Sequence, residues 1–261
     1  MISKGQIPAP QQRGSRRRNL RGRDYWDDDT ETLNDIVSAK ESKKNNPCPL
    51  CSHPDVVRYH RDNLRSYLQC SRCKLVFVPF HERLTRAEEK ARYDLHRNDP
   101  YDPRYRSFLS RLTKPLLERI PPGSEGLDFG CGPGPALAMM LREQGHPMTV
   151  YDPFYAPDDS VWMRTYDFIT ATEVSEHLYR PGEELDRLFR VLNPGGWLGI
   201  MTKQPPDAEE LCNWHYMRDP THVCFFRLPT FEYIADSQEA SLTIICSDVI
   251  LYQKKRLSIT D

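Results

Sequence analysis

The sequence has no long apolar run: no stretch approaches the roughly 20 apolar residues that a membrane-spanning helix requires. The first ten residues, Met1 to Pro10, also lack the apolar core of a secretory signal. Together these absences predict a protein that has no membrane partner and acts in the cytoplasm.

Neither sign of charge is in excess, since 36 Lys and Arg residues stand against 37 Asp and Glu residues. A near-neutral balance argues against a surface built entirely for nucleic acid. Four of the eight cysteines form two close pairs, and the others are scattered along the chain. In a reducing compartment such pairs favour metal ligands over disulfides.

Residues 1–45 are poor in apolar residues and rich in Pro, Gln, Gly, Arg and Asp, which predicts a disordered tail. The tail carries a basic run followed directly by an acidic run: Arg13, Arg16, Arg17, Arg18, Arg21 and Arg23, then Asp24, Asp27, Asp28, Asp29 and Glu31. A basic arm binds phosphates, but adjacent acidic residues weaken its field. We favour a solvated tail, and the role of the arginine run stays open.

Residues 46–80 contain two cysteine pairs among short segments that predict a small β-rich module. The pattern is C-x2-C, 18 residues, and C-x2-C, formed by Cys48, Cys51, Cys70 and Cys73. Two tight turns that each present two thiolates complete a tetrahedron around Zn²⁺. The spacing predicts a zinc ribbon. Four protein ligands close the site, so the metal is expected to be structural.

Residues 81–122 predict a helical linker or lid, and strands alternate with helices after residue 123. This alternation predicts an α/β fold with a mostly parallel sheet covered on both faces. The last two predicted strands, 242–246 and 249–253, are close enough to form only a hairpin, so the sheet ends antiparallel.

A glycine-rich loop follows the first strand of this region. Gly130, Gly132 and Gly134 permit a tight turn and a close approach to a ligand. Asp152 ends the next strand, 24 residues after Asp128, and a carboxylate there accepts hydrogen bonds from both hydroxyls of a ribose. The spacing G-x-G-x-G differs from the G-x-G-x-x-G of dinucleotide-binding folds and favours another ligand.

Residues 127–134 resemble motif I of class I S-adenosylmethionine-dependent methyltransferases. Residues 166–177 and 192–198 resemble the fourth strand of that family and the turn before its fifth. The resemblance covers about residues 104–255 and implies a Rossmann-like, S-adenosylmethionine-binding domain over residues 123–261.

The resemblance also implies roles for individual residues. The three glycines line the methionine part of the cofactor, Asp152 holds its ribose, and Asp128 orients the loop and the cofactor's amino group. We assign Glu173, which follows the fourth strand, to the same cofactor site. The family places a helix and a third strand between its second and fourth strands, but residues 153–166 are too few for that crossover. Phe154 and Trp162 are therefore candidates for stacking on adenine.

Methyl transfer requires an aligned nucleophile and often a base, which we expect beyond the carboxyl ends of the strands. Glu173, Glu176 and His177 resemble an E-x-x-E-H pattern of quinone-pathway O-methyltransferases, where it can hold a divalent metal. Alternatively, His177 is a general base or braces the next helix.

Two further segments supply candidates for the acceptor side of the site. Residues 214–226 combine aromatic and polar side chains, from which we take His215, Arg218 and His222. A cluster before the first strand occupies the position of the family's lid, although an ordinary polar surface explains it equally well: Tyr93, His96, Asn98, Asp102 and Tyr105.

Together these features predict an enzyme that transfers the methyl group of S-adenosylmethionine to a small molecule. The arrangement resembles bacterial methyltransferases with an N-terminal zinc-binding domain, some acting on nucleotide sugars and others on ribosomal RNA. One alternative is therefore an RNA methyltransferase, for rRNA or tRNA, whose basic ribbon binds RNA with a steep salt dependence. The shortened adenine segment leaves a second alternative, a non-catalytic module that binds the cofactor and a partner.

Overall fold

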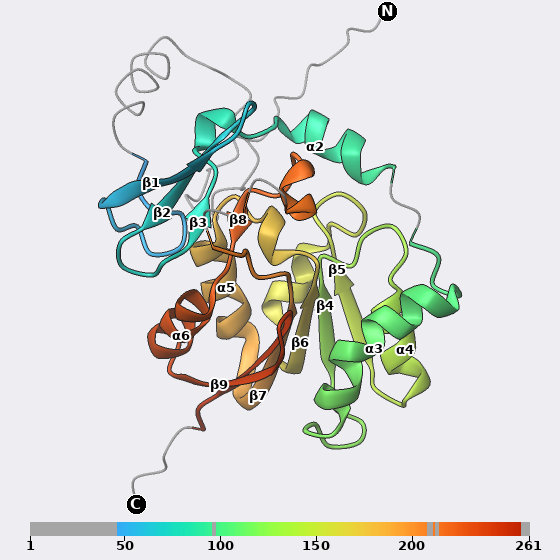
Figure 1. Cartoon of the computed structure of the whole chain (residues 1–261). Coiled ribbons are helices and arrows are strands. Elements are labelled where there is room, and N and C mark those ends of the chain that lie inside the picture. The colour runs from blue at the N-terminus through green and yellow to red at the C-terminus, as the bar shows by residue number, and fades with distance from the viewer. Residues whose placement is uncertain (1–45, 96–97, 208–210, 212–213, 257–261) are drawn as a thin grey trace, which may run out of the picture.

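The structure is a computed structural model that describes residues 46–95, 98–207, 211 and 214–256 (Figure 1). The predicted tail, with its arginine run, and His96 lie outside the described residues. Within the described part of the chain, no helix is both long and apolar enough to cross a membrane.

A six-stranded sheet organises the chain from residue 126 onward, in the order β5-β4-β6-β7-β10-β9. Strands β5, β4, β6 and β7 are parallel, while β10 is antiparallel to both β7 and β9. The strands are β4 (Gly126–Phe129), β5 (Met148–Tyr151), β6 (Tyr166–Thr172), β7 (Leu192–Met201), β9 (Ala240–Cys246) and β10 (Val249–Lys254). The predicted Rossmann-like sheet with its C-terminal hairpin is confirmed.

Helices cover both faces of this sheet. Helices α3 (Pro103–Leu117) and α4 (Ala136–Glu143) lie on one face, and α5 (Pro181–Val191) and α6 (Leu228–Ser237) lie on the other (Figure 1). The Asp102 carboxylate caps α3 by accepting a hydrogen bond from the backbone N–H of Arg104 at 2.9 Å. Helix α3, which lies in the segment 81–122 predicted as a linker or lid, is thus one of the helices that cover the large sheet. The domain boundaries at residues 45, 80 and 122 stay predictions.

A short connection replaces the usual crossover between β5 and β6. It contains the 3-10 helix η2 (Asp159–Met163), and β5 is left at the edge of the sheet. The Trp162 ring packs edge-on against Phe129 and Tyr151, with centroids 6.1 and 4.8 Å away. The guanidinium carbon of Arg187 lies 3.6 Å from the Trp162 centroid. Trp162 therefore covers the sheet and is itself covered by an arginine.

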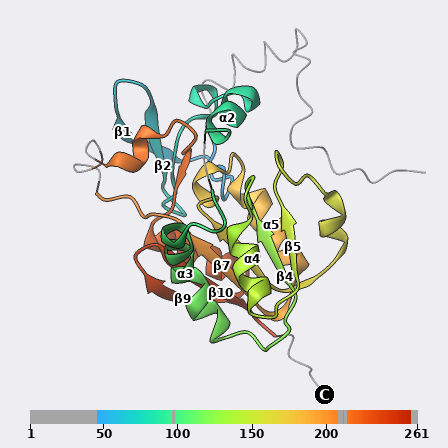
Figure 2. The same ribbon diagram turned by 90° about the vertical axis from the view of Figure 1, so that its right-hand side faces the viewer.

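The cysteine-containing segment forms a second, antiparallel sheet in the order β1-β2-β3-β8. Strands β1 (Val56–Arg61), β2 (Ser66–Cys70) and β3 (Val76–Phe77) belong to the ribbon, but β8 (Cys224–Phe225) comes from the segment after β7. One hydrophobic core runs through the ribbon and one face of the large sheet. The two sheets therefore form one packed unit, with β1, β2 and helix α2 (Arg86–Tyr93) at the same end of the molecule (Figure 2).

Candidate functional site

A cavity of about 1090 Å³ lies beyond the carboxyl ends of β4, β5 and β6, the position at which open parallel sheets bind ligands. Segments that follow these strands form its walls, and α2 contributes Arg86, Glu89 and Tyr93. From β4 onward, eight of the predicted site residues line it: Gly130, Gly132, Asp152, Phe154, Trp162, Glu173, His177 and His222. Asp128, Gly134, His215 and Arg218 are not part of this lining.

The glycine loop has the backbone conformation that its sequence predicts. Gly130 and Gly132 adopt φ values of +72° and +62°, which side chains other than glycine rarely tolerate. The Gly130 N–H donates to the Tyr151 carbonyl at 2.8 Å. A Cβ atom at Gly130 would lie 2.4 Å from Cγ2 of Val174, so position 130 requires glycine for both its conformation and its surroundings.

Gly130→Ala is expected to destabilise the protein by about 2–4 kcal/mol, because a positive φ and an overpacked contact each cost about 1–3 kcal/mol. Urea denaturation measures this change. Gly145→Ala is the matched control, since Gly145 has a φ of +85° but open space around its Cβ position. Equal losses in the two variants would show that the contact with Val174 contributes nothing.

The Asp152 carboxylate borders the cavity and is 7% exposed. Its Oδ1 accepts hydrogen bonds from the backbone N–H groups of Phe154 and Tyr155 at 2.8 and 3.1 Å. Its Oδ2 accepts one from the Gly132 N–H at 3.0 Å. Asp152 therefore fixes the glycine loop and the turn after β5 relative to each other.

Asp128 and Gly134 support the glycine loop from behind. The buried Asp128 carboxylate accepts a hydrogen bond from Thr170 Oγ1 at 2.8 Å. Burial raises the pKa of Asp128 to about 7, against the opposing effect of hydrogen bonds from Thr170 and the Ala138 backbone. A Cβ atom at Gly134 would lie 2.2 Å from the Asn98 carbonyl oxygen. Both positions thus serve packing between β4, β6, α4 and the chain before α3.

Glu173 follows β6 in a strained conformation, with a φ of +53° that is uncommon outside glycine. Its Oε1 is buried and has no hydrogen-bond partner among the described residues, while its Oε2 accepts from the Tyr216 hydroxyl at 3.4 Å. Burial, with the nearby Glu176, raises the pKa of Glu173 to about 8. A strained, incompletely satisfied carboxyl group in a cavity wall is typical of a ligand contact.

His177 and His222 meet at the cavity with their ring centroids 4.7 Å apart. Nδ1 of His177 lies 3.2 Å from the Thr221 carbonyl, and Nδ1 of His222 lies 2.7 Å from the Tyr216 carbonyl. Because a carbonyl only accepts, Nδ1 of each ring is assigned a proton and donates it. Burial lowers the pKa of His222 to about 4, so its ring is neutral at pH 7.

Glu176 is fully buried beneath the two histidines. Its carboxylate accepts hydrogen bonds from the Tyr216 hydroxyl and from Thr202 Oγ1, the latter at 2.8 Å. Glu176, His177 and His222 each place one possible metal-ligand atom within 4.8 Å of the other two. Glu173 does not belong to this group. A divalent cation at this position would thus use His222 in place of the Glu173 of the E-x-x-E-H pattern.

His215 and Arg218 lie on the outside of the 3-10 helix η5 (His215–Arg218). This helix buries Tyr216 and Met217 and leaves its two ends exposed. His215 Nε2 is 3.1 Å from Lys203 Nζ. The structure therefore does not bring these two predicted residues to the cavity.

Helix α2 contributes a carboxylate that the sequence reasoning missed. Glu89 is 3% exposed and lines the cavity. The Tyr93 hydroxyl donates to its Oε1 at 2.7 Å, while its Oε2 has no hydrogen-bond partner among the described residues. Burial raises the pKa of Glu89 to about 7. Of the predicted cluster before β4, Tyr93, Asn98 and Tyr105 line the cavity.

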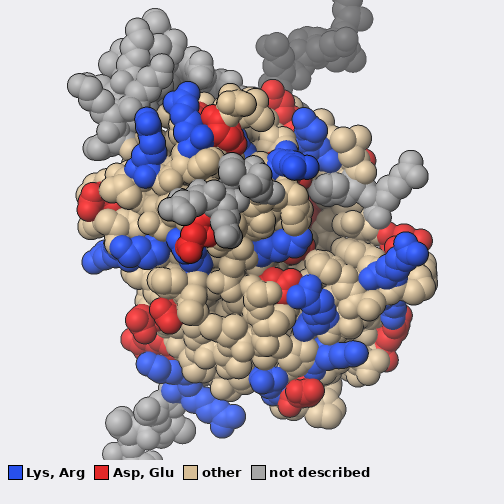
Figure 3. Space-filling view, in the orientation of Figure 1, with Lys and Arg blue, Asp and Glu red and all other residues tan. Residues whose placement is uncertain are grey.

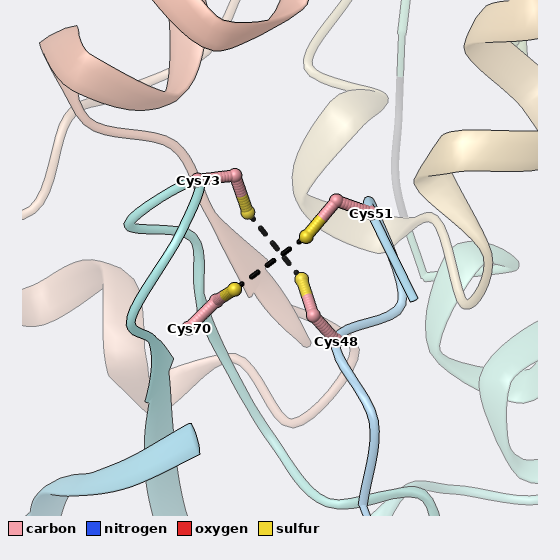
Figure 4. Close-up of side chains that lie close together, drawn as sticks. All are labelled: Cys48, Cys51, Cys70 and Cys73. Atoms are coloured by element: carbon pink, nitrogen blue, oxygen red, sulfur yellow. Dashed lines mark hydrogen bonds between the residues drawn. The ribbon is translucent and has the colours of Figure 1, made fainter. Parts of the chain in front are cut away.

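The four ribbon cysteines converge on one point (Figure 4). Sγ of Cys48 lies 3.4 Å from that of Cys73, Sγ of Cys51 lies 3.5 Å from that of Cys70, and all four lie within 4.8 Å of one another. These separations exceed a disulfide bond of about 2.05 Å and suit Zn–S bonds of about 2.3 Å. The thiols are mostly buried and lie outside the cavity lining, so the set fits a structural zinc ion.

A family described as a methyltransferase domain matches residues 101–246 of the chain. No curated protein matches the chain. Among solved structures, the chain is similar to 1,6-didemethyltoxoflavin-N1-methyltransferase from Burkholderia thailandensis, with 15% identity over 76% of this chain and 99% of that one and a TM-score of 0.44. An O-methyltransferase family protein from the same organism is 15% identical over 65% of this chain and 63% of its own, with a TM-score of 0.42.

Proposed function

The chain belongs to the methyltransferase domain family and is an S-adenosylmethionine-dependent methyltransferase, and we propose that its acceptor is a small molecule bound in the cavity. The cavity itself carries this proposal, with a volume of about 1090 Å³ and with α2 across it. Small-molecule and cofactor pockets usually measure about 300–1,000 Å³. The space thus suits the cofactor together with a small acceptor.

The cofactor supplies a methyl group on a sulfonium centre, and the glycine-loop side of the cavity binds it. The backbone at Gly130 and Gly132 would hold the methionine part, and Asp152 would accept a hydrogen bond from the ribose. Oε1 of Glu173, which has no hydrogen-bond partner in the described part of the chain, would accept from the cofactor's ammonium group. Phe154 is held by α2, since its ring lies 5.6 Å from that of Tyr93, and it borders the adenine.

The histidine side of the cavity receives the acceptor. His222 is neutral, so its Nε2 lone pair would accept a hydrogen bond from an acceptor hydroxyl and take the proton that this oxygen releases on methylation. The ring of His177, which packs against that of His222, would hold the His222 ring in the orientation needed for this proton transfer.

Two variants separate cofactor binding from methyl transfer. Asp152→Asn is expected to weaken binding of S-adenosylhomocysteine about 10–100-fold, because hydrogen bonds to charged groups contribute about 1.5–3 kcal/mol. His222→Gln is expected to keep that affinity and to lower transfer by about 100-fold or more, the usual scale of general acid–base catalysis. Calorimetric titration measures the first effect, and transfer of a labelled methyl group to a pool of small metabolites measures the second.

An RNA acceptor is the alternative, favoured by the exposed Arg58, Arg61 and Arg72 on the ribbon. Against it, Lys and Arg residues are interspersed with Asp and Glu over the face drawn in Figure 3, which limits attraction to a polyanion. Two results would favour RNA over a small molecule as the acceptor. The labelled methyl group would appear in RNA rather than in small metabolites, and binding to RNA would fall steeply as the salt concentration increases.

A further inference from the structure

Helix α2 packs directly on the turn that follows Asp152. The Arg86 guanidinium donates to the Pro153 carbonyl at 3.3 Å and lies 5.2 Å from the Phe154 ring centroid. At the other end of the helix, the Asp94 carboxylate accepts from the Tyr155 hydroxyl at 2.7 Å. The helix therefore lies along residues 153–155, immediately beside the carboxylate expected to hold the cofactor's ribose.

Glu89 is on the face of α2 that meets this turn. It follows Arg86 by three residues and precedes Tyr93 by four, and residues at these spacings share one helix face. Arg86 and Tyr93 both contact Phe154. The hydrogen bond from the Tyr93 hydroxyl fixes Oε1 of Glu89, which leaves Oε2 as an oriented, buried acceptor in the cavity wall.

Asp152 lacks the capacity to bind a ribose alone. A carboxylate offers about four acceptor positions, two on each oxygen. Backbone N–H groups of Phe154 and Tyr155 use both positions on Oδ1, and that of Gly132 uses one on Oδ2. One position is left for a ribose that presents two hydroxyl groups. A second acceptor beside Asp152 would therefore complete the binding of the two hydroxyl groups.

We propose that Glu89 is a cofactor-binding residue, whose Oε2 accepts one ribose hydroxyl of S-adenosylmethionine while Oδ2 of Asp152 accepts the other. This assignment satisfies a buried oxygen that has no other partner among the described residues. It rests on the proposed placement of the cofactor. It also gives α2 a direct part in cofactor binding, in addition to covering the acceptor.

Titration of S-adenosylhomocysteine and of its 2′-deoxy and 3′-deoxy analogues into three proteins tests the assignment. Wild type is expected to bind each analogue about tenfold more weakly than the parent, and Glu89→Gln to bind the parent about tenfold more weakly than wild type does. For one of the two analogues, Glu89→Gln is expected to bind as well as wild type, because that analogue lacks the hydroxyl that Glu89 accepts.

Glu88→Gln is the matched control. Glu88 lies on the exposed side of the same helix, where it completes a capping box with Thr85, and glutamine preserves such a box. An equal loss for all three ligands in Glu89→Gln, or no loss, would overturn the assignment, and a change confined to the KM of the acceptor would place Glu89 on the acceptor instead. Failure of wild type to bind S-adenosylhomocysteine would contradict the proposed cofactor site rather than the role of Glu89.

Discussion

Cys73→Ser is expected to lower the midpoint of thermal unfolding by at least about 10 °C and to abolish methyl transfer. Structural zinc contributes about 10–16 kcal/mol to the folding of small zinc domains, and each kcal/mol shifts the midpoint by about 2–4 °C in a domain of 150–250 residues. Cys73 is fully buried in the sulfur cluster. Calorimetry, with zinc content determined by elemental analysis, measures the change.

The loss of activity is expected because the ribbon is built into the larger domain. Strand β3 pairs with β8, so that Val76 and Phe77 lie opposite Phe225 and Cys224. Unfolding of the ribbon would expose β8 and release the segment that carries His222. Cys246→Ser is the control, since Cys246 lies on β9, outside both the sulfur cluster and the cavity lining. Full activity and an unchanged midpoint after zinc removal would contradict a structural role for the metal.

The sequence predicted the parts of the site that depend on local chain geometry. The glycine loop and Asp152 lie at the ends of adjacent parallel strands, where strand order alone places them together. The four cysteines converge because each pair occupies one tight turn, and left-handed residues follow the pairs at Ser52 and Lys74. In both cases a short motif specifies its own three-dimensional arrangement.

The residues that were missed or misplaced depend on burial. Glu89 stands in the charged stretch RAEEKARY, where nothing local distinguishes the one buried carboxylate from its exposed neighbour Glu88. His215 and Arg218 share the segment of His222, but the turns of η5 direct them outward. Asp128 lies behind the loop, between β4 and β6, a position that agrees with its predicted role of orienting the loop.

Long-range contacts were equally inaccessible to sequence reasoning. The pairing of β3 with β8 joins segments almost 150 residues apart, through strands of two residues each. Such short apolar runs carry too little periodicity to be recognised as partners. The ribbon therefore looked like a separate domain in the sequence, although its core is continuous with that of the large sheet.

Arg65→Lys is expected to lower methyl transfer by about 100-fold and to change the affinity for S-adenosylhomocysteine by less than about threefold. A misplacement of a reacting group by about 1 Å lowers the reaction rate by about 100-fold. Arg65 is 8% exposed and belongs to the ribbon, yet its two terminal nitrogens donate to backbone carbonyls of the segment that carries His222. The accepting oxygens lie at 2.9–3.2 Å and belong to Met217, Asp219, Pro220 and His222.

Lysine cannot replace this arrangement, because an ammonium group has three donors on one atom whereas a guanidinium has five in a planar fork. The fifth donor of Arg65, its Nε–H, donates to the Tyr67 hydroxyl at 3.3 Å. Steady-state kinetics and calorimetric titration separate turnover from cofactor binding, and Arg61→Lys, on the exposed side of β1, is the control. A parallel loss of cofactor affinity would show general destabilisation. Loss of turnover alone would support the proposal that Arg65 positions His222, and it would link the cysteine-containing segment to methyl transfer.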